Sequence, residues 1–450
     1  MKIPPHRRHT LANGVKLILL PRLGVPLIAF DAVVRGGARL DAERHAGLAS
    51  ITAELLTRGA GQRDAYGFAD AVEGAGGSMD AGAQSEAIIL HGQFLARDRA
   101  LMLQLLADAL QRPRFEAEEL DSVRDRRIEF IKAAKDSEPQ SLIGSYGRAL
   151  LFGAHPFGRP ISGSEQSLAA LTREHVWQFY QQHVGADRLT LVFAGDFDPD
   201  EMLSAVTEGF EGWRTALTPL PALPAPERER GRNVLLVDAP GSAQTYFWIG
   251  NVGVARSYAR RAALEITNTA FGGSFGSMLM QALRVKNGLT YSAGSSFRRG
   301  SVPAEFAISS FTQTASTRQA VELALTTLDT LKLEGASERS IDSARSYILG
   351  QYPLAFETSA DWAAALAELE LYGLPDSYID GFADALRQVD APQSRQVVAD
   401  AFPNSQDVDI VLIGDASQIR PDAGRWGALQ EMPLAAPVFQ PPARLQSSVM

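Results

Sequence analysis

Arg284 and Tyr291 are two side chains of this sequence whose types and spacing could act together on a bound substrate. A fixed cation and a phenol can both donate hydrogen bonds to an oxygen atom on which negative charge grows. They stand seven residues apart, on either side of Lys286-Asn287-Gly288, where a basic last turn and a glycine predict the end of a helix. Both side chains could therefore point to one side of a tight turn. Spacing alone favours a simpler interpretation, a cationic helix end followed by a half-buried aromatic residue of a strand.

A glycine-rich loop opens the stretch from 271 to 297, which contains this pair. Glycine permits backbone angles closed to other residues and lets another chain approach closely, so we interpret the loop as a surface against which another chain can lie. Apolar residues at helical spacing predict a helix from Ser277 to Val285. Leu289 to Ser292 is then predicted to form a strand that carries Tyr291.

This stretch resembles the second half of the pitrilysin/insulinase metallopeptidases, also called inverzincins. The matching residues are Asn268, Gly272-Gly273, Phe275, Ser277, Leu279, Leu283-Arg284, Gly288-Leu289 and Tyr291. In that family an Arg/Tyr pair holds the substrate and helps to stabilise the transition state at a zinc centre carried by the other half. Arg284 and Tyr291 match the pair in type and spacing, so the resemblance implies the same catalytic role for them.

The resemblance also directs attention to a zinc motif, H-x-x-E-H, in which two histidines on a helix bind the metal and the glutamate activates water. The matching helix here is predicted from Gly47 to Leu56, but the motif is missing. Ser50 and Glu54 stand at the histidine positions, and Ala53 stands at the glutamate position. Phe130 replaces the glutamate that would be the third ligand. We therefore expect this chain to bind no metal and to be inactive alone.

Other catalytic chemistry finds no support in the sequence. The seven histidines are scattered, and the close pair His6 and His9 lacks a third ligand. The absence of cysteine excludes thiolate metal sites, cysteine nucleophiles and disulfides. The sequence also lacks a Walker loop and a dinucleotide fingerprint. The turn at 74–77 is glycine-rich but has no Lys-Ser/Thr tail, so we interpret it as a structural turn.

Composition describes a soluble globular protein of more than one domain. The chain has 450 residues, of which 45% are hydrophobic and 21% are charged. A net charge of -9 argues against nucleic acid as a partner and provides no basic face for membranes. The most apolar early stretch, Val15 to Val34, is broken by charged residues and prolines, so it predicts two strands and no membrane span. The first strand is expected near Thr10, so a leader sequence could have been removed.

Two copies of one design are predicted on either side of a linker. Residues 216–232 hold four prolines and a charged run, which is typical of a stiff, solvated linker. The strand-like segment 189–196 is echoed by 408–415 at an offset of 219 residues, close to half the chain length. We therefore divide the chain into an N-terminal peptidase-like domain with the degenerate zinc site, the linker, and a C-terminal peptidase-like domain with the Arg/Tyr pair, at residues 1–215, 216–232 and 233–450.

The order of elements within each copy predicts an α+β fold, in which helices cover a mainly antiparallel sheet. In the first copy, the predicted elements besides the motif helix are a strand at 85–94 and helices at 98–111, 117–135 and 172–183, the last with Thr172 as its N-cap. The family resemblance implies two such homologous domains facing each other like a clam shell.

The leading hypothesis is a non-catalytic subunit that pairs with a zinc-bearing paralogue to form a heterodimeric peptidase. Arg284 and Tyr291 would reach the partner's zinc site, which holds an unfolded peptide substrate. The substrate-binding loop would consist of Gly272, Gly273, Ser274 and Gly276.

Two alternatives stay open, a pseudo-peptidase that serves as a structural scaffold and a peptide-binding homodimer. Zinc is expected in the partner subunit only. Bacterial relatives of the two-chain type are often exported, so we expect the periplasm, with the cytoplasm as the alternative.

Overall fold

The computed structural model describes residues 1–228 and 230–441. Contacts divide the chain into two compact units, each of which gathers three separate segments of sequence. The division into 1–215, 216–232 and 233–450 stays a prediction. The first unit consists of Met1–Glu129, Ile161–Ala222 and Gln351–Phe382, and the second consists of Phe130–Pro160, Leu223–Gly350 and the chain from Ala383 onwards.

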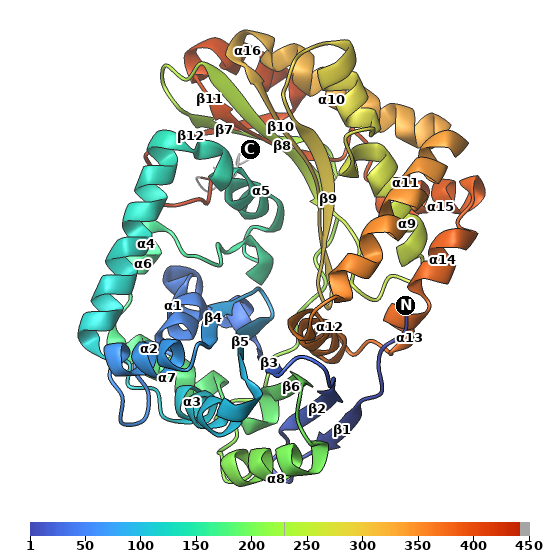
Figure 1. Ribbon diagram of the computed structural model, residues 1–450. Coiled ribbons are helices and arrows are strands. Elements are labelled where there is room, and N and C mark those ends of the chain that lie inside the picture. The colour runs from blue at the N-terminus through green and yellow to red at the C-terminus, as the bar shows by residue number, and fades with distance from the viewer. Residues whose placement is uncertain (229, 442–450) are drawn as a thin grey trace. The chain divides into compact units, whose positions relative to one another are not determined.

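A six-stranded sheet forms the centre of the first unit (Figure 1). The strand order is β1-β2-β6-β3-β5-β4, and only the β2–β6 pair is parallel. The apolar stretch at 15–34 forms two strands, as the sequence predicts. The strands are β1 (Arg7–Thr10), β2 (Lys16–Pro21), β3 (Leu27–Arg35), β4 (Ser78–Ala83), β5 (Ala87–Leu95) and β6 (Leu189–Gly195).

The second unit has a sheet of the same size with the order β12-β7-β11-β8-β10-β9. Five of its strands, β7 to β11, repeat the connectivity of β2 to β6. The echoed sequence segments are β6 and β11, which occupy the same position in the two sheets and are buried at every residue. The strands are β7 (Asn233–Asp238), β8 (Gln244–Val252), β9 (Ala293–Arg299), β10 (Pro303–Gln313), β11 (Asp409–Gly414) and β12 (Ala428–Pro433).

The helices of the first half of the chain include all those that the sequence predicts. Thr172 caps α7 as expected: its hydroxyl accepts a hydrogen bond from the backbone N–H of His175, and the His175 ring accepts one from the Thr172 backbone. The helices are α1 (Leu48–Leu55), α2 (Ala65–Gly74), α3 (Arg99–Gln111), α4 (Ala117–Ser137), α5 (Ile143–Phe152), α6 (Glu165–Ala169), α7 (Arg173–His183) and α8 (Pro199–Phe210).

Eight α-helices are described in the second half. Together with the two mainly antiparallel sheets, they confirm the predicted α+β fold with two homologous domains. No helix in the described part of the chain is both long and apolar enough to cross a membrane. The helices are α9 (Arg261–Asn268), α10 (Thr317–Glu334), α11 (Glu338–Gln351), α12 (Ser359–Tyr372), α13 (Ser377–Asp380), α14 (Phe382–Gln388), α15 (Ala391–Ala401) and α16 (Ala416–Trp426).

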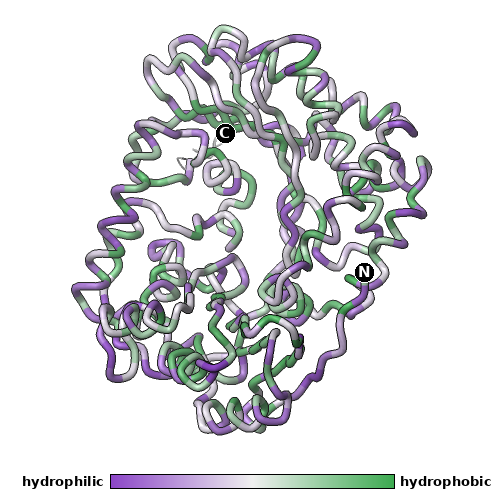
Figure 2. The backbone as a smooth tube through the Cα atoms, viewed as in Figure 1, coloured by the Kyte–Doolittle hydropathy of each residue, from purple (hydrophilic) through white to green (hydrophobic). Residues whose placement is uncertain are grey.

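Each sheet is covered by a helix from the other half of the chain, an exchange that the sequence did not predict. Helix α12 packs on β3 and β6 of the first sheet, where Trp362 and Leu366 join a core with Leu20, Val33 and Val192. The hydrophobic residues of these elements are visible as green segments in Figure 2. Because burial of apolar surface drives this packing, α12 belongs to the first unit although it lies late in the sequence.

Helix α5 makes the reciprocal contact, on β8 and β11 of the second sheet. Gly147 allows its close approach, since a Cβ atom at this position would lie 2.6 Å from the indole of Trp248. Each exchanged helix also carries a charge that is paired on its sheet. Arg148 of α5 lies 3.6 Å from Glu305, and Glu370 of α12 lies 3.1 Å from Arg8.

Leu366 provides a test of this packing. Leu366→Ala leaves a cavity between α12 and the first sheet, so we expect the free energy of unfolding to fall by about 2 to 4 kcal/mol. Leu333→Ala, at a position on α10 that is 86% exposed, should change it by less than about 0.5 kcal/mol. Urea unfolding followed by circular dichroism measures both variants. Equal effects would contradict the assignment of α12 to this core.

Candidate functional site

The predicted helix before Tyr291 is present, but it is wound as a π-helix from Met280 to Lys286. It ends as the sequence predicts. Gly288 adopts a left-handed backbone conformation (φ +61°), and its N–H donates to the carbonyl of Arg284 at 2.9 Å. The N–H of Leu289 donates to the carbonyl of Leu283 at 2.8 Å, which completes the cap. The chain therefore turns sharply just before Tyr291.

The predicted strand from Leu289 to Ser292 is wrong, because β9 begins only at Ala293. Two hydroxyl groups of β10 hold this segment in place of a backbone ladder. Thr312 Oγ1 donates to the Leu289 carbonyl at 2.7 Å, and Ser310 Oγ donates to the Ser292 carbonyl at 2.8 Å. Tyr291 consequently lies on an irregular loop and not on a strand.

Arg284 and Tyr291 are brought into direct contact. The guanidinium carbon lies 4.3 Å from the centroid of the Tyr291 ring, and Arg284 Nη1 donates to the Tyr291 carbonyl at 3.0 Å. The same guanidinium lies 5.0 Å from the ring centroid of Phe275. Tyr291 is 72% exposed and Phe275 is 64% exposed. Arg284 and Tyr291 thus form a cation–aromatic contact at the protein surface, where a ligand from solvent can reach both side chains. Their action on a substrate stays a prediction.

The glycine-rich loop has a structural basis of its own. A Cβ atom on Gly272 would lie 2.3 Å from Ser295 Oγ, so packing against β9 requires glycine there. Gly273 has no such tight contact, and the space around Gly276 is open. The hydroxyl of Ser274 donates to the carbonyl of Thr269 at 3.2 Å. Binding of substrate by this loop stays a prediction, and open space for it is found at Gly276.

The degenerate motif positions on α1 are tied together by an arginine from α4. Arg127 Nη1 donates to Ser50 Oγ at 2.7 Å, and Arg127 Nη2 lies 2.6 Å from Glu54 Oε2. Arg126 also pairs with the Glu54 carboxylate, and Arg58 lies 3.7 Å from it. A guanidinium therefore bridges the two positions that carry histidine ligands in the family motif. We call these three residues, Ser50, Glu54 and Arg127, the arginine clamp.

Zinc does not fit the residues of this region. Ala53, at the position of the base, is completely buried, and Phe130, at the position of the third ligand, is 66% exposed. A bound cation would have to displace the guanidinium of Arg127, and Ser50 and Glu54 supply no nitrogen ligand. Among residues 1–228 and 230–441, no three or more His, Cys, Asp and Glu side chains are grouped so that they could hold a metal ion.

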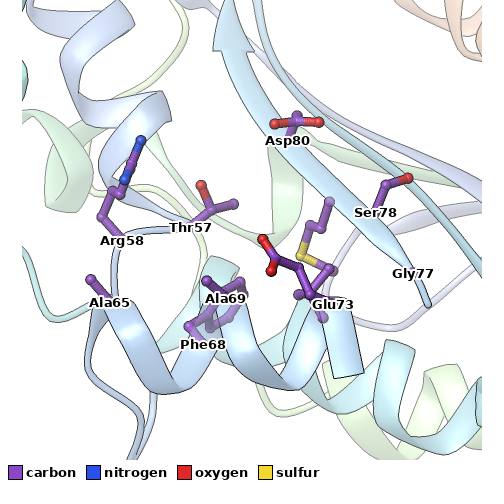
Figure 3. Close-up of a pocket in the computed structure, with 11 residues that line it drawn as sticks. Thr57, Arg58, Ala65, Phe68, Ala69, Glu73, Gly77, Ser78 and Asp80 are labelled. Atoms are coloured by element: carbon purple, nitrogen blue, oxygen red, sulfur yellow. The ribbon is translucent and has the colours of Figure 1, made fainter. Parts of the chain in front are cut away.

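A pocket of about 340 Å³ lies at the C-terminal end of α1, between α2 and β4 (Figure 3). Thr57 and Arg58 line it from the turn that follows α1, Glu73 from α2, and Ser78 and Asp80 from β4. The glycine-rich turn between α2 and β4 predicted only a structural turn and no pocket. Its polar lining mixes both charges, so it selects no single class of ligand.

Asp31 is a buried carboxyl group in the middle of the first sheet. It lies opposite His91 of β5, which in turn lies opposite Asp80 of β4, so the three side chains share one face of the sheet. Asp31 is only 8% exposed, and burial raises the pKa of its carboxyl to about 7. The only sequence signal was one acidic residue inside an apolar strand.

These features define a peptidase-like class of protein, with two repeats of one α+β design and without a complete metal motif in the first. Known proteins agree with this class. Residues 29–165 match the model described as insulinase, peptidase family M16, and residues 170–348 match the model described as the peptidase M16 inactive domain. The chain therefore belongs to the insulinase family of peptidases, M16, as a member of the inactive type.

Bacterial proteins are among the relatives with similar sequences. An uncharacterized zinc protease of Mycobacterium leprae is 27% identical over 398 residues, which cover 87% of each chain. Uncharacterized zinc protease YmxG of Bacillus subtilis is 24% identical over 353 residues, which cover 78% of this chain and 85% of that protein.

Solved structures show the same fold. The peptidase M16 inactive domain from Pseudomonas fluorescens has a TM-score of 0.85 at 21% identity, over 91% of this chain and 98% of that chain. A protease from Helicobacter pylori has a TM-score of 0.82 at 17% identity, over 91% of this chain and all of that one.

Arg127→Met tests whether the arginine clamp stabilises the protein. It removes the hydrogen bonds to Ser50 and leaves Glu54 with fewer partners, so we expect the free energy of unfolding to fall by about 1 to 3 kcal/mol. The matched control is Arg124→Met on the same helix, because the ion pairs of Arg124 within residues 1–228 and 230–441 are with the exposed carboxylates of Asp121 and Asp125. This control should cost less than about 1 kcal/mol. Urea unfolding measures the difference, and a harmless Arg127→Met would refute the role of the clamp.

Asp31→Asn tests the buried carboxyl through pH. The folded-state pKa of about 7 lies above the ordinary value of 3.8, so the folded chain loses stability as pH rises from about 4 to 7. Asparagine stays neutral and avoids this loss. We expect the variant to be more stable than the parent by on the order of 2 to 4 kcal/mol at pH 8, with the difference shrinking toward pH 4.

Urea unfolding at several pH values provides the measurement, with Asp70→Asn at an exposed position of α2 as the control. His91 and Asp80 lie in the same cross-strand row as Asp31, so the profile should be repeated with His91→Gln, which removes one ionisable neighbour. A stability difference that does not change with pH would contradict the assignment of the raised pKa to Asp31.

Proposed function

We propose that this chain is the non-catalytic subunit of a heterodimeric zinc metallopeptidase. A paralogous subunit with an intact H-x-x-E-H motif would hold the zinc ion, which supplies the Lewis acid and the activated water of peptide hydrolysis. This chain would contribute Arg284 and Tyr291 to the handling of the peptide. Membership of the M16 family supports the reaction class, and the arginine clamp supports the assignment of the zinc to a partner.

The observation that carries the proposal is the exposed contact between Arg284 and Tyr291. The backbone carbonyl of Tyr291 already accepts one N–H of the guanidinium, which fixes the orientation of the group. Since arginine has five N–H donors, others stay available for a peptide carbonyl. The phenol of Tyr291 can donate to the same oxygen as it becomes negatively charged. A ready-made donor pair of this kind stabilises a transition state more than the substrate, as catalysis requires.

Sheet edges offer a place for the rest of the peptide. Strands β4 and β9 are the edges of their sheets. An edge strand presents backbone N–H and C=O groups, to which an extended peptide can add as a further strand. Backbone hydrogen bonds of this type are independent of the side chains of the peptide. They suit an unfolded substrate of varied sequence.

The arginine clamp also favours a second candidate, a pseudo-peptidase that acts as a scaffold or as a peptide-binding homodimer. A helix pair held by a guanidinium keeps its shape without a metal, which is sufficient for a structural subunit. The two candidates differ in one respect. A scaffold has no use for donors at Arg284 and Tyr291, whereas a subunit of a peptidase does.

Peptidase activity of a mixture with a zinc-bearing paralogue tests the proposal. An unstructured fluorogenic peptide should be cleaved by the mixture and not by this chain alone. Arg284→Ala should lower kcat of the mixture about 100-fold and Tyr291→Phe about 10-fold, because each removes a donor that acts in the transition state. Arg318→Ala and Tyr347→Phe, at exposed positions elsewhere, are the matched controls and should leave kcat unchanged.

Association of the two chains should be measured in parallel by size-exclusion chromatography. Slow cleavage by a variant that still associates supports a direct role of the pair. A mixture no more active than the paralogue alone, or silent substitutions at 284 and 291, would favour the scaffold.

A further inference from the structure

A gap opens beside Tyr291 where β9 separates from β10. The two strands are paired from Pro303 as far as Ser310, which lies opposite Ala293. Beyond that point, residues 311–313 of β10 are paired with β8 but, within the described residues, with no strand on the other side. Residues 289–292 lie beside this end of β10 but do not pair with it as a strand. Instead, the carbonyls of Leu289 and Ser292 accept hydrogen bonds from the hydroxyls of Thr312 and Ser310.

This gap is a pocket of about 280 Å³. Its floor is formed by the end of β10 with the start of β8, and its wall by the loop that carries Tyr291. The volume lies just below the range of sites for small-molecule ligands, so it suits a single side chain. Main lining residues are Gln244, Leu289, Thr290, Tyr291, Phe311 and Gln313.

The lining of this pocket is uncharged. Amide and hydroxyl groups can exchange hydrogen bonds with a polar side chain, and the rings of Tyr291 and Phe311 can contact an apolar one. A charged side chain would lose part of its hydration there, and none of the lining residues carries an opposite charge. The pocket therefore selects for neutral residues and against acidic and basic ones.

We propose that this pocket is a specificity site that takes one uncharged side chain of the peptide, next to the bond handled by Arg284 and Tyr291. The inference rests on the proposed function and deepens it, because Tyr291 belongs both to the pocket wall and to the donor pair. A peptide whose carbonyl meets the phenol places a neighbouring side chain within reach of the pocket. The pocket selects peptides by that one side chain, while the peptide backbone is bound outside the pocket.

Gln313→Glu tests the pocket by adding a negative charge to its exposed rim. Binding of fluorescent Gly/Ser peptides that carry a single Gln, Phe, Lys or Glu is measured by anisotropy on this chain alone. The unaltered chain should bind the Gln and Phe peptides several-fold tighter than the Lys and Glu peptides. Gln313→Glu should shift the preference toward the Lys peptide by roughly fivefold, the size expected of an exposed ion pair.

Gln388→Glu is the matched control, since it makes the same charge change at an exposed site of α14. Equal affinities for the four peptides, no binding of any, or the same shift in both variants would overturn the inference. Cleavage by the mixture with the paralogue is measured separately. If the preference shifts in the binding assay and the mixture does not cleave, the pocket stands and the proposed peptidase role fails. If the mixture cleaves and the preference does not shift, the proposed peptidase role stands and the specificity pocket fails.

Discussion

Burial of one face of each sheet beneath a helix from the other half of the chain is the constraint on which this structure depends. Helix α12 closes the core of the first unit, and α5 packs on the second sheet. Neither unit is complete until both halves of the chain have been made, because each contains segments from both halves. β4 and β9 each stand at one end of their sheet, with β1 and β12 at the other ends.

The two halves have diverged around this common frame in chemically different ways. In the first, the helix that resembles a metal-binding helix is held by a guanidinium. A planar fork of N–H donors matches a hydroxyl and a carboxylate at the same time, which a point cation does not. In the second, a half-buried arginine lies against two exposed aromatic rings and keeps donors available. Arginine thus has different effects in the two halves. Paired with a carboxylate, its guanidinium occupies the motif positions of the first half, whereas against aromatic rings in the second half it keeps N–H donors for a ligand.

Most of the fold could be predicted from the sequence, because apolar periodicity and caps such as Thr172 and Gly288 are local signals. The exchange of α5 and α12 could not be predicted, since the apolar face of a helix indicates that it will be buried but not against which sheet. The missing metal motif was evident from Ser50, Ala53 and Glu54, but the arginine that pairs with Ser50 and Glu54 was not. Arg127 lies in a charged helical segment, 73 positions after Glu54. From the sequence alone, such a position predicts an ordinary surface residue. The strand predicted at 289–292 failed because side-chain hydroxyls replace its backbone ladder there.

The arginine clamp sets the order in which a metal centre could be built on α1. Such a centre would require new ligands at 50, 54 and 130 and a base at 53, together with the removal of Arg127. A histidine introduced alone would face a fixed positive charge and would forfeit existing hydrogen bonds, so it would cost stability before any metal could bind. Replacement of Arg127 would therefore have to come before the first new ligand.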